Sequence, residues 1–134
     1  MELVSDVTFP LDLSGVTLSD STGIRHSFTP GTLLQPRKVV VVFGGGTPSC
    51  AMPLGVIVQA ASTGSFSLSD AGETITLKNA AGTTIESVAY PVSNPDVSFS
   101  RSPDVTGAFV LHNAIPASGG SHHSPGRKAD GSAF

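Results

Sequence analysis

Residues 38–43 read KVVVVF, a continuous apolar run bounded by Pro36 and by three glycines at residues 44–46. A strand that is covered on both faces has no need of polar residues at alternate positions, so it appears as an unbroken apolar segment. Valine also favours the extended conformation because its branched Cβ packs well on a pleated surface. The sequence therefore predicts a central β-strand over residues 38–43.

Two hairpins are predicted on either side of this strand. Residues 16–28 alternate between apolar and polar side chains around a polar turn at residues 20–23, and residues 74–90 do the same around a turn at residues 79–82. Alternation with a period of two, interrupted by turn residues, is the pattern of paired antiparallel strands. Shorter strands are predicted at residues 2–4, 57–58, 97–99 and 108–111.

The composition fits an all-β domain. The chain has 134 residues, with 39% hydrophobic and 13% charged residues, 15 glycines and 10 prolines. This is too apolar for a disordered chain, and the glycines and prolines indicate many turns between short strands. We expect one domain over residues 1–134, an all-β sandwich of about seven to nine antiparallel strands. Its core is expected over residues 1–112, followed by an irregular tail over residues 113–134.

The charge pattern argues against a nucleic-acid partner. The net charge is −3, and the seven lysines and arginines are scattered along the sequence. A protein that binds duplex nucleic acid gathers its basic residues on one face. No apolar stretch approaches the roughly 20 residues that cross a bilayer. We therefore expect neither a nucleic-acid partner nor a membrane span.

The sequence offers no catalytic constellation. Serine, histidine and aspartate are all present, but there is no G-x-S-x-G nucleophile elbow, and the glycines at residues 44–46 lack the lysine of a phosphate-binding loop. Asp12, Asp20, Asp70 and Asp104 each lie beside serine, glycine or proline, where aspartate commonly caps its own turn. We expect no catalytic residues and no enzyme activity.

Histidines near the end of the chain raise the question of a metal. His112, His122, His123 and Cys50 include the donor types that bind zinc. The adjacent pair lacks the spacing that lets two side chains hold one ion, and the surrounding Gly/Ser-rich segment gives no fixed geometry. We expect solvated histidines, with no metal and no cofactor.

Several short segments, in their order along the chain, resemble the lamin tail domain family in the form found in bacterial proteins. They are residues 11–20, Phe28, residues 31–33, 39–43, 66–77, 82–90, 100–104 and 124–126. The resemblance implies an immunoglobulin-like sandwich without catalytic residues. Family members in animals are the tails of nuclear intermediate filaments. Bacterial members are parts of secreted or surface proteins, often beside nuclease- or phosphatase-like hydrolase domains, so the resemblance also suggests an extracellular or surface location.

The start of the chain departs from the family pattern. Family members usually have a strand upstream of the segment that matches Glu2, Leu3 and Val4, and here nothing precedes Met1. A strand without its neighbour exposes unpaired N–H and C=O groups, which recruit another chain. We therefore expect self-association through this N-terminal edge. Arg101 is a second candidate for binding, because its planar guanidinium suits carboxylate or phosphate groups; the alternative is a structural role at a strand end.

Two functions remain open at this point. The first is a non-catalytic binding or structural module that mediates protein–protein interaction, or positioning, within a larger secreted or surface protein. The alternative is an accessory domain that docks the substrate or the catalytic domain of a secreted nuclease- or phosphatase-like hydrolase. Both rest on fold-level resemblance, and the sequence names no partner.

Overall fold

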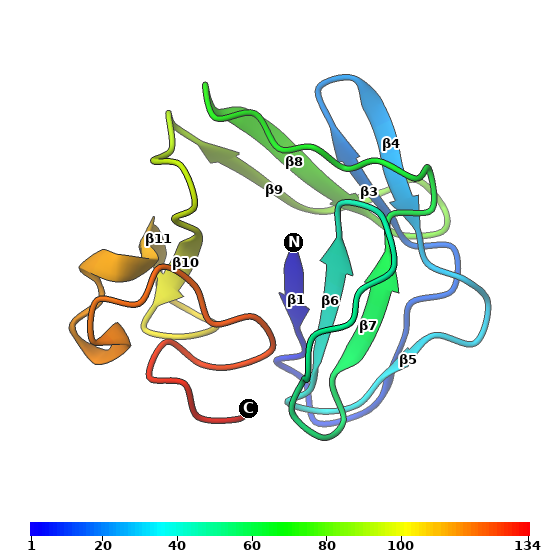
Figure 1. Ribbon diagram of the computed structural model, residues 1–134. Coiled ribbons are helices and arrows are strands. Elements are labelled where there is room, and N and C mark those ends of the chain that lie inside the picture. Colours follow the sequence, from blue (N-terminus) through cyan, green and yellow to red (C-terminus); the bar gives the residue numbers. More distant parts are fainter.

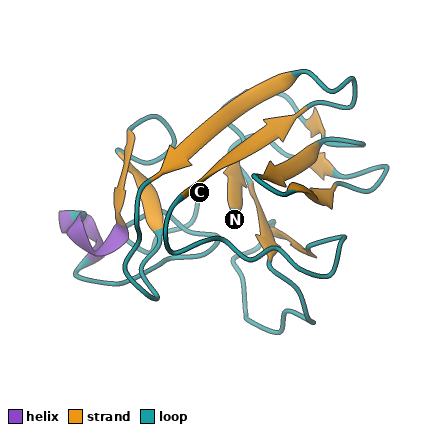
Figure 2. Cartoon of the chain, turned by 90° about the horizontal axis from the view of Figure 1, so that it is seen from above, coloured by secondary structure: helices purple, strands orange, loops and turns teal.

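A computed structural model describes all residues 1–134 as a chain built almost entirely of strands (Figure 1). The two 3-10 turns, η1 (His112–Ala114) and η2 (Pro116–Ser118), lie together at one side of the molecule (Figure 2). No helical segment has the length and apolarity that a membrane crossing requires. The eleven strands are β1 (Glu2–Val4), β2 (Leu11–Asp12), β3 (Thr17–Asp20), β4 (Gly23–Ser27), β5 (Leu33–Leu34), β6 (Val39–Phe43), β7 (Ile57–Ala60), β8 (Glu73–Lys78), β9 (Thr84–Tyr90), β10 (Phe99–Ser102) and β11 (Ala108–Leu111).

Two larger sheets form the layers of a sandwich. One has the strand order β1-β6-β7 and the other has the order β4-β3-β8-β9. Two small ladders, β2-β5 and β10-β11, complete the structure, and the β10–β11 hairpin lies beyond β9 (Figure 1). The predicted all-β sandwich is confirmed. The two-residue strands β2 and β5 raise the strand count above the expected seven to nine.

The predicted hairpins are confirmed as β3–β4 and β8–β9. Their turns are held by the side chains that the sequence indicates, since Asp20 Oδ1 accepts from the Thr22 N–H at 2.8 Å and Asn79 Oδ1 accepts from the Ala81 N–H at 3.0 Å. The strand expected at residues 97–99 begins only at Phe99, because Val97 is still part of a turn that its N–H closes on Asn94 O.

The central strand is confirmed as β6. Its four valines, at residues 39–42, are each at most 5% exposed. It pairs with β1 on one side in antiparallel fashion and with β7 on the other in parallel fashion. The parallel pair departs from the expected antiparallel pattern. The connection over residues 44–56 is long enough to return the chain to the same end of the sheet before β7 begins.

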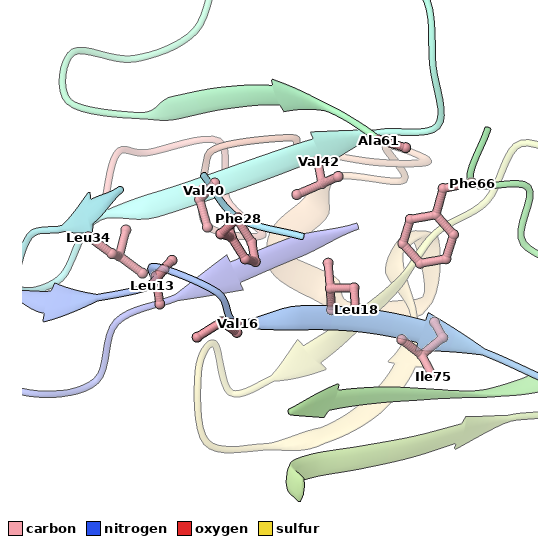
Figure 3. Close-up of a cluster of buried hydrophobic side chains, with 10 residues drawn as sticks. All are labelled: Leu13, Val16, Leu18, Phe28, Leu34, Val40, Val42, Ala61, Phe66 and Ile75. Atoms are coloured by element: carbon pink, nitrogen blue, oxygen red, sulfur yellow. The ribbon is translucent and has the colours of Figure 1, made fainter. Parts of the chain in front are cut away.

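The hydrophobic core lies between the two larger sheets (Figure 3). β6 contributes Val40 and Val42 from one layer, while β3 and β8 contribute Leu18 and Ile75 from the other. Phe28, 2% exposed, also belongs to this cluster. The remaining members are Leu13, Val16, Leu34, Ala61 and Phe66. Burial of these side chains is the main favourable term that joins the layers.

The other face of β6 lies beneath the C-terminal segment. Glu2 on β1 is the register partner of Val41, so their side chains share the face opposite Val40. The Gly126 N–H donates to Glu2 Oε2 at 2.7 Å, which places residues near 126 on that face. Ala129, 6% exposed, is buried in the same segment. β6 is therefore covered on both sides, by the second sheet and by the tail.

Two glycines after β6 are required by a close approach of two backbone segments. A Cβ atom added to Gly44 would lie 2.7 Å from Phe66 O, and one added to Gly45 would lie 2.5 Å from Gly64 O. The Phe66 N–H also donates to Gly44 O, at 2.6 Å. Gly44 and Gly45 therefore serve close packing between backbone segments.

Substitution by alanine should affect stability very differently at two leucines, one in the core and one on the surface. Leu18 is 1% exposed and Leu54 is 97% exposed. We expect Leu18→Ala to lower the free energy of unfolding by about 2–5 kcal/mol, because it leaves a cavity between the sheets. Leu54→Ala should change it by less than about 0.5 kcal/mol. Urea unfolding followed by circular dichroism measures both; equal effects would contradict this assignment of the core.

Candidate functional site

The N-terminal strand is not a fully exposed edge. Glu2, Leu3 and Val4 are all half-buried in β1. β1 pairs only with β6, but the tail lies against it through the bond from the Gly126 N–H to the Glu2 carboxylate. Burial raises the pKa of this carboxyl above its ordinary value. The sequence argument expects an edge open to solvent here, whereas the structure places the tail against the Glu2 side chain, on one face of β1. Self-association through this edge remains a prediction.

Arg101 is committed to contacts within the chain. Its Nη1 donates to Gly107 O at 2.9 Å, and its Nη2 pairs with the carboxylate of Glu86. The guanidinium also lies over the ring of Phe109, with Cζ 4.3 Å from the ring centroid. These contacts join the β10–β11 hairpin to β9. Arg101 and β1 have no residue in common among their side-chain contacts, so the structure does not join them into one site.

The expectation of solvated histidines is wrong for His112. This residue is 0% exposed, and its Nδ1 lies 2.9 Å from Ser100 Oγ. The chain after β11 folds back, with the Ser98 N–H donating to His122 O at 3.0 Å, and the imidazole of His112 is enclosed as a result. His122 and His123 are exposed, as is Cys50. No three histidine, cysteine, aspartate or glutamate side chains come close enough to hold a metal ion.

The aspartates divide into two kinds. Asp12 and Asp20 cap their own turns as expected, with Asp12 Oδ1 accepting from the Ser14 N–H at 2.9 Å. The expectation is wrong for Asp70 and Asp104. Their carboxylates accept from distant segments, Asp70 from the hydroxyl of Ser93 at 3.4 Å and Asp104 from the N–H of Ala129 at 3.1 Å. Asp104 is therefore a second anchor for the tail.

Two cavities lie where the tail meets the body. One, of about 340 Å³, lies between residues 50–52 and the tail. The other, of about 310 Å³, is lined by Ser5, by two aspartates (Asp6 and Asp104) and by two basic residues (Arg37 and Lys128). Ser5 is 2% exposed, and its hydroxyl has no hydrogen-bond partner. Because the lining mixes both signs of charge evenly, it selects neither anions nor cations.

One edge of the four-stranded sheet is closed by a polar loop. The Ser27 N–H of β4 donates to Ser62 Oγ at 2.9 Å. Arg25 O of the same strand accepts from the hydroxyl of Thr63 at 2.8 Å. Main-chain groups that point away from β3 are thus satisfied by residues 62–63. Another chain cannot pair with β4 unless it displaces this loop.

His26 holds the closing loop in place from within the sandwich. Its side chain is 2% exposed, and its Nδ1 accepts from the Ser62 N–H at 3.2 Å. This assigns the ring proton to Nε2, which donates to Gln59 Oε1 at 2.8 Å. Burial lowers the pKa of His26 below its usual value. The imidazole is therefore neutral in the folded protein, with both nitrogens bonded.

The opposite edge of the same sheet, β9, is open. β9 ends the sheet, pairs only with β8 and is the longest strand. None of the hydrogen bonds outside the strand ladders involves a main-chain group of residues 84–90. Residues 84–87 are all exposed, and Ile85 is 56% exposed. β7 also ends its sheet, but it has four residues against the seven of β9.

The two faces of β9 differ in what they contact. Val88 is the register partner of buried Ile75, so Glu86, Val88 and Tyr90 point inward while Ser87 and Ala89 point outward. A bulge in the β8–β9 ladder leaves Ile85 without a register partner, so this residue lies outside the alternation. On the inward side Tyr90 contacts Phe99 of the hairpin, with ring centroids 5.8 Å apart. The hairpin therefore contacts β9 through inward side chains and forms no main-chain hydrogen bond with it.

The sequence did not reveal this edge, although it contains one signal. Glu86 is an ionisable residue at an inward position of a strand, which is a device that proteins use at sheet edges. In residues 84–90 it is the only charged side chain, and the strand has no lysine or proline. The order of strands in a sheet is a non-local property, so alternation alone does not show which strand lies outermost.

Two layered sheets around one hydrophobic core define an immunoglobulin-like β-sandwich module. The chain belongs to the Lamin Tail Domain family, whose model matches residues 2–91. This match covers β1 to β9 and confirms the resemblance seen in that part of the sequence. Comparison with curated proteins finds no match. Membership of this family indicates a binding or structural module of a generally non-catalytic kind.

The neutral imidazole of His26 predicts that acid destabilises the domain. Below its usual pKa of 6.5 the unfolded chain binds a proton that the folded protein excludes, so stability is lost as the pH falls from 6.5 towards the lowered pKa. One buried imidazole lowers the free energy of unfolding by at most about 1.4 kcal/mol when the pH falls to about 5.5. His112, whose pKa burial also lowers, acts in the same direction.

Urea unfolding at pH values of about 7.5 and 5.5 tests this prediction. The pH-dependent loss of stability should be smaller in His26→Gln than in the wild type. The exposed control His122→Gln should keep the full wild-type loss. An unchanged loss in His26→Gln would show that His26 becomes protonated in the folded protein.

Proposed function

We propose that this lamin tail domain is a non-catalytic module that binds a protein partner by adding an extended segment of that partner to the open edge of β9. The proposal is carried by one observation, a seven-residue strand that ends its sheet with no residue outside β8 bonded to its main chain. An unpaired row of N–H and C=O groups is a template for another strand, and this mode of recognition recurs in peptide-binding domains.

The asymmetry between the two edges of the sheet supports this function. A loop anchored by His26 closes β4, whereas nothing comparable covers β9. Main-chain pairing gives affinity, and the alternating pockets beside a strand give specificity. The side chains of Ile85 and Ala89 on β9 are both exposed and offer apolar contacts to a partner. An apolar or β-branched residue of the partner fits such contacts.

The proposed role extends to the architecture of a larger protein. A rigid sandwich that receives a strand on one edge positions whatever is attached to that strand. In a secreted or surface protein the segment could belong to a separate protein, and an adjacent hydrolase domain could dock in the same way. Both roles use the same edge and differ in what supplies the strand.

Selection from a random peptide library displayed on phage tests the proposal. We expect the wild-type domain to select extended peptides whose addition shifts the amide NMR signals of residues 84–90. Ile85→Lys should weaken their binding about tenfold or more, because lysine on an edge opposes pairing. Ile24→Lys is the matched control, since Ile24 is 55% exposed on the closed edge against 56% for Ile85. Selected peptides that shift other residues, or no selected peptides at all, would overturn the proposal.

A further inference from the structure

We infer that the cavity lined by Asp6, Arg37, Asp104 and Lys128 binds a small zwitterion of the amino-acid type, a molecule with one carboxylate and one ammonium group. We call this space, of about 310 Å³, the mixed-charge cavity. No residue of β9 lines it, so the inference goes beyond the proposed function of that edge. Three observations meet in this one place.

The first observation is that four charged side chains line the cavity without pairing with one another. Two of them are acidic and two are basic. The structure has two ion pairs, one within the β3–β4 hairpin and one between β9 and β10, and neither involves these four residues. Asp104 also keeps one carboxylate oxygen for a ligand, because the Ala129 N–H occupies only Oδ1. The lining therefore offers unpaired charges of both signs.

The second observation is backbone strain at residues that line the cavity. The Lys38 N–H donates to Gln35 O at 3.0 Å, which closes a turn with Pro36 and Arg37 at its centre. Arg37 has a φ of 57°, in the left-handed region that favours glycine. A turn with this conformation at its third residue normally has glycine or asparagine there. Arginine at this position thus keeps a guanidinium beside the cavity at a conformational cost.

Val105 is strained in the same way. Its φ is 71°, which is rare for a β-branched residue. The Thr106 N–H donates to Asp104 O at 2.9 Å and closes a three-residue turn around it, and turns of this size with a positive central φ are strained. The chain has three non-glycine residues with positive φ, and two of them, Arg37 and Val105, line this cavity. Strained residues gather where ligands are held.

The third observation is a buried hydroxyl without a partner. Ser5 lines the cavity, is 2% exposed, and has no hydrogen bond to its Oγ. Its N–H, in contrast, donates to Lys38 O at 3.0 Å. An unpaired buried polar group is costly, and in a native fold it indicates a partner that the chain itself does not supply.

The lining defines the chemistry of the ligand. The two basic side chains suit a carboxylate and the two acidic side chains suit an ammonium group. A ligand with charge of one sign would meet two like charges, whereas a zwitterion satisfies both pairs. Val4 and Val105 add apolar surface for an aliphatic side chain. The cavity lies at the lower end of the size range of small-molecule sites, so we expect a single amino acid and a dissociation constant on the order of 0.1–1 mM.

Saturation-transfer NMR with each of the common amino acids tests the inference. We expect the wild-type protein to bind at least one with an aliphatic side chain. Loss of either charged group from the ligand should weaken binding about tenfold or more. For valine the matched analogues are isovalerate, which lacks the amino group, and isobutylamine, which lacks the carboxylate. Binding of none of the amino acids, or equal binding of the singly charged analogues, would overturn the inference.

Three variants test the location of the site. Lys128→Gln should weaken binding about tenfold, whereas Arg127→Gln, the same charge change at a neighbour outside this cavity, should bind as the wild type does. Arg37→Gly removes the guanidinium but supplies the residue that the backbone favours, so binding should fall without a lower melting temperature. Circular dichroism checks each fold. Wild-type affinity in both Lys128→Gln and Arg37→Gly, or equal loss in Arg127→Gln, would overturn the site. Peptide binding at β9 is a separate measurement and would stand or fall independently.

Discussion

The burial of β6 on both of its faces is the constraint on which the rest of the structure depends. Val40 and Val42 face the second sheet, and Val41 lies on the opposite face, where Glu2 binds Gly126 of the tail. Both edges of β6 are paired as well, with β1 and with β7. A strand so enclosed has no contact with solvent to offer a ligand. Function must therefore lie at the periphery, where sheets end and loops cover them or leave them open.

The strands at the periphery differ in what covers them. The tail lies against β1, the loop at residues 62–63 satisfies the outer groups of β4, and buried His26 holds that loop by accepting the Ser62 N–H. β9 has no such cover, although it is the longest strand, and only a bulge at Ile85 interrupts its ladder with β8. An exposed strand edge promotes aggregation unless it is protected or used. Glu86 gives partial protection through its inward charge, and its pairing with Arg101 limits the desolvation that a bound strand would impose.

Local sequence patterns predict most of the strands. They do not predict how the strands are ordered in the sheets or which side chains the later segments bury. Unbroken valines identified β6, and alternation around the turns at Asp20 and Asn79 identified two hairpins. The parallel return of β7 and the outermost place of β9 depend on how distant segments pack, which no local period encodes. His112 was expected in solvent for the same reason, because its burial depends on the chain folding back to Ser98. The family resemblance, which implies a strand before Glu2, instead predicts an open edge at β1.

The central claim is that one edge of the four-stranded sheet is open and the other is closed. Amide hydrogen exchange by NMR, at a concentration low enough to keep the protein monomeric, tests it most directly. Amides along residues 86–90 of β9, where the register with β8 is regular, should alternate, slow where they bond to β8 and fast where they point outward. The Ser27 amide of β4 should be slow because it donates to Ser62. Uniformly slow exchange along β9, or fast exchange at Ser27, would contradict the claim.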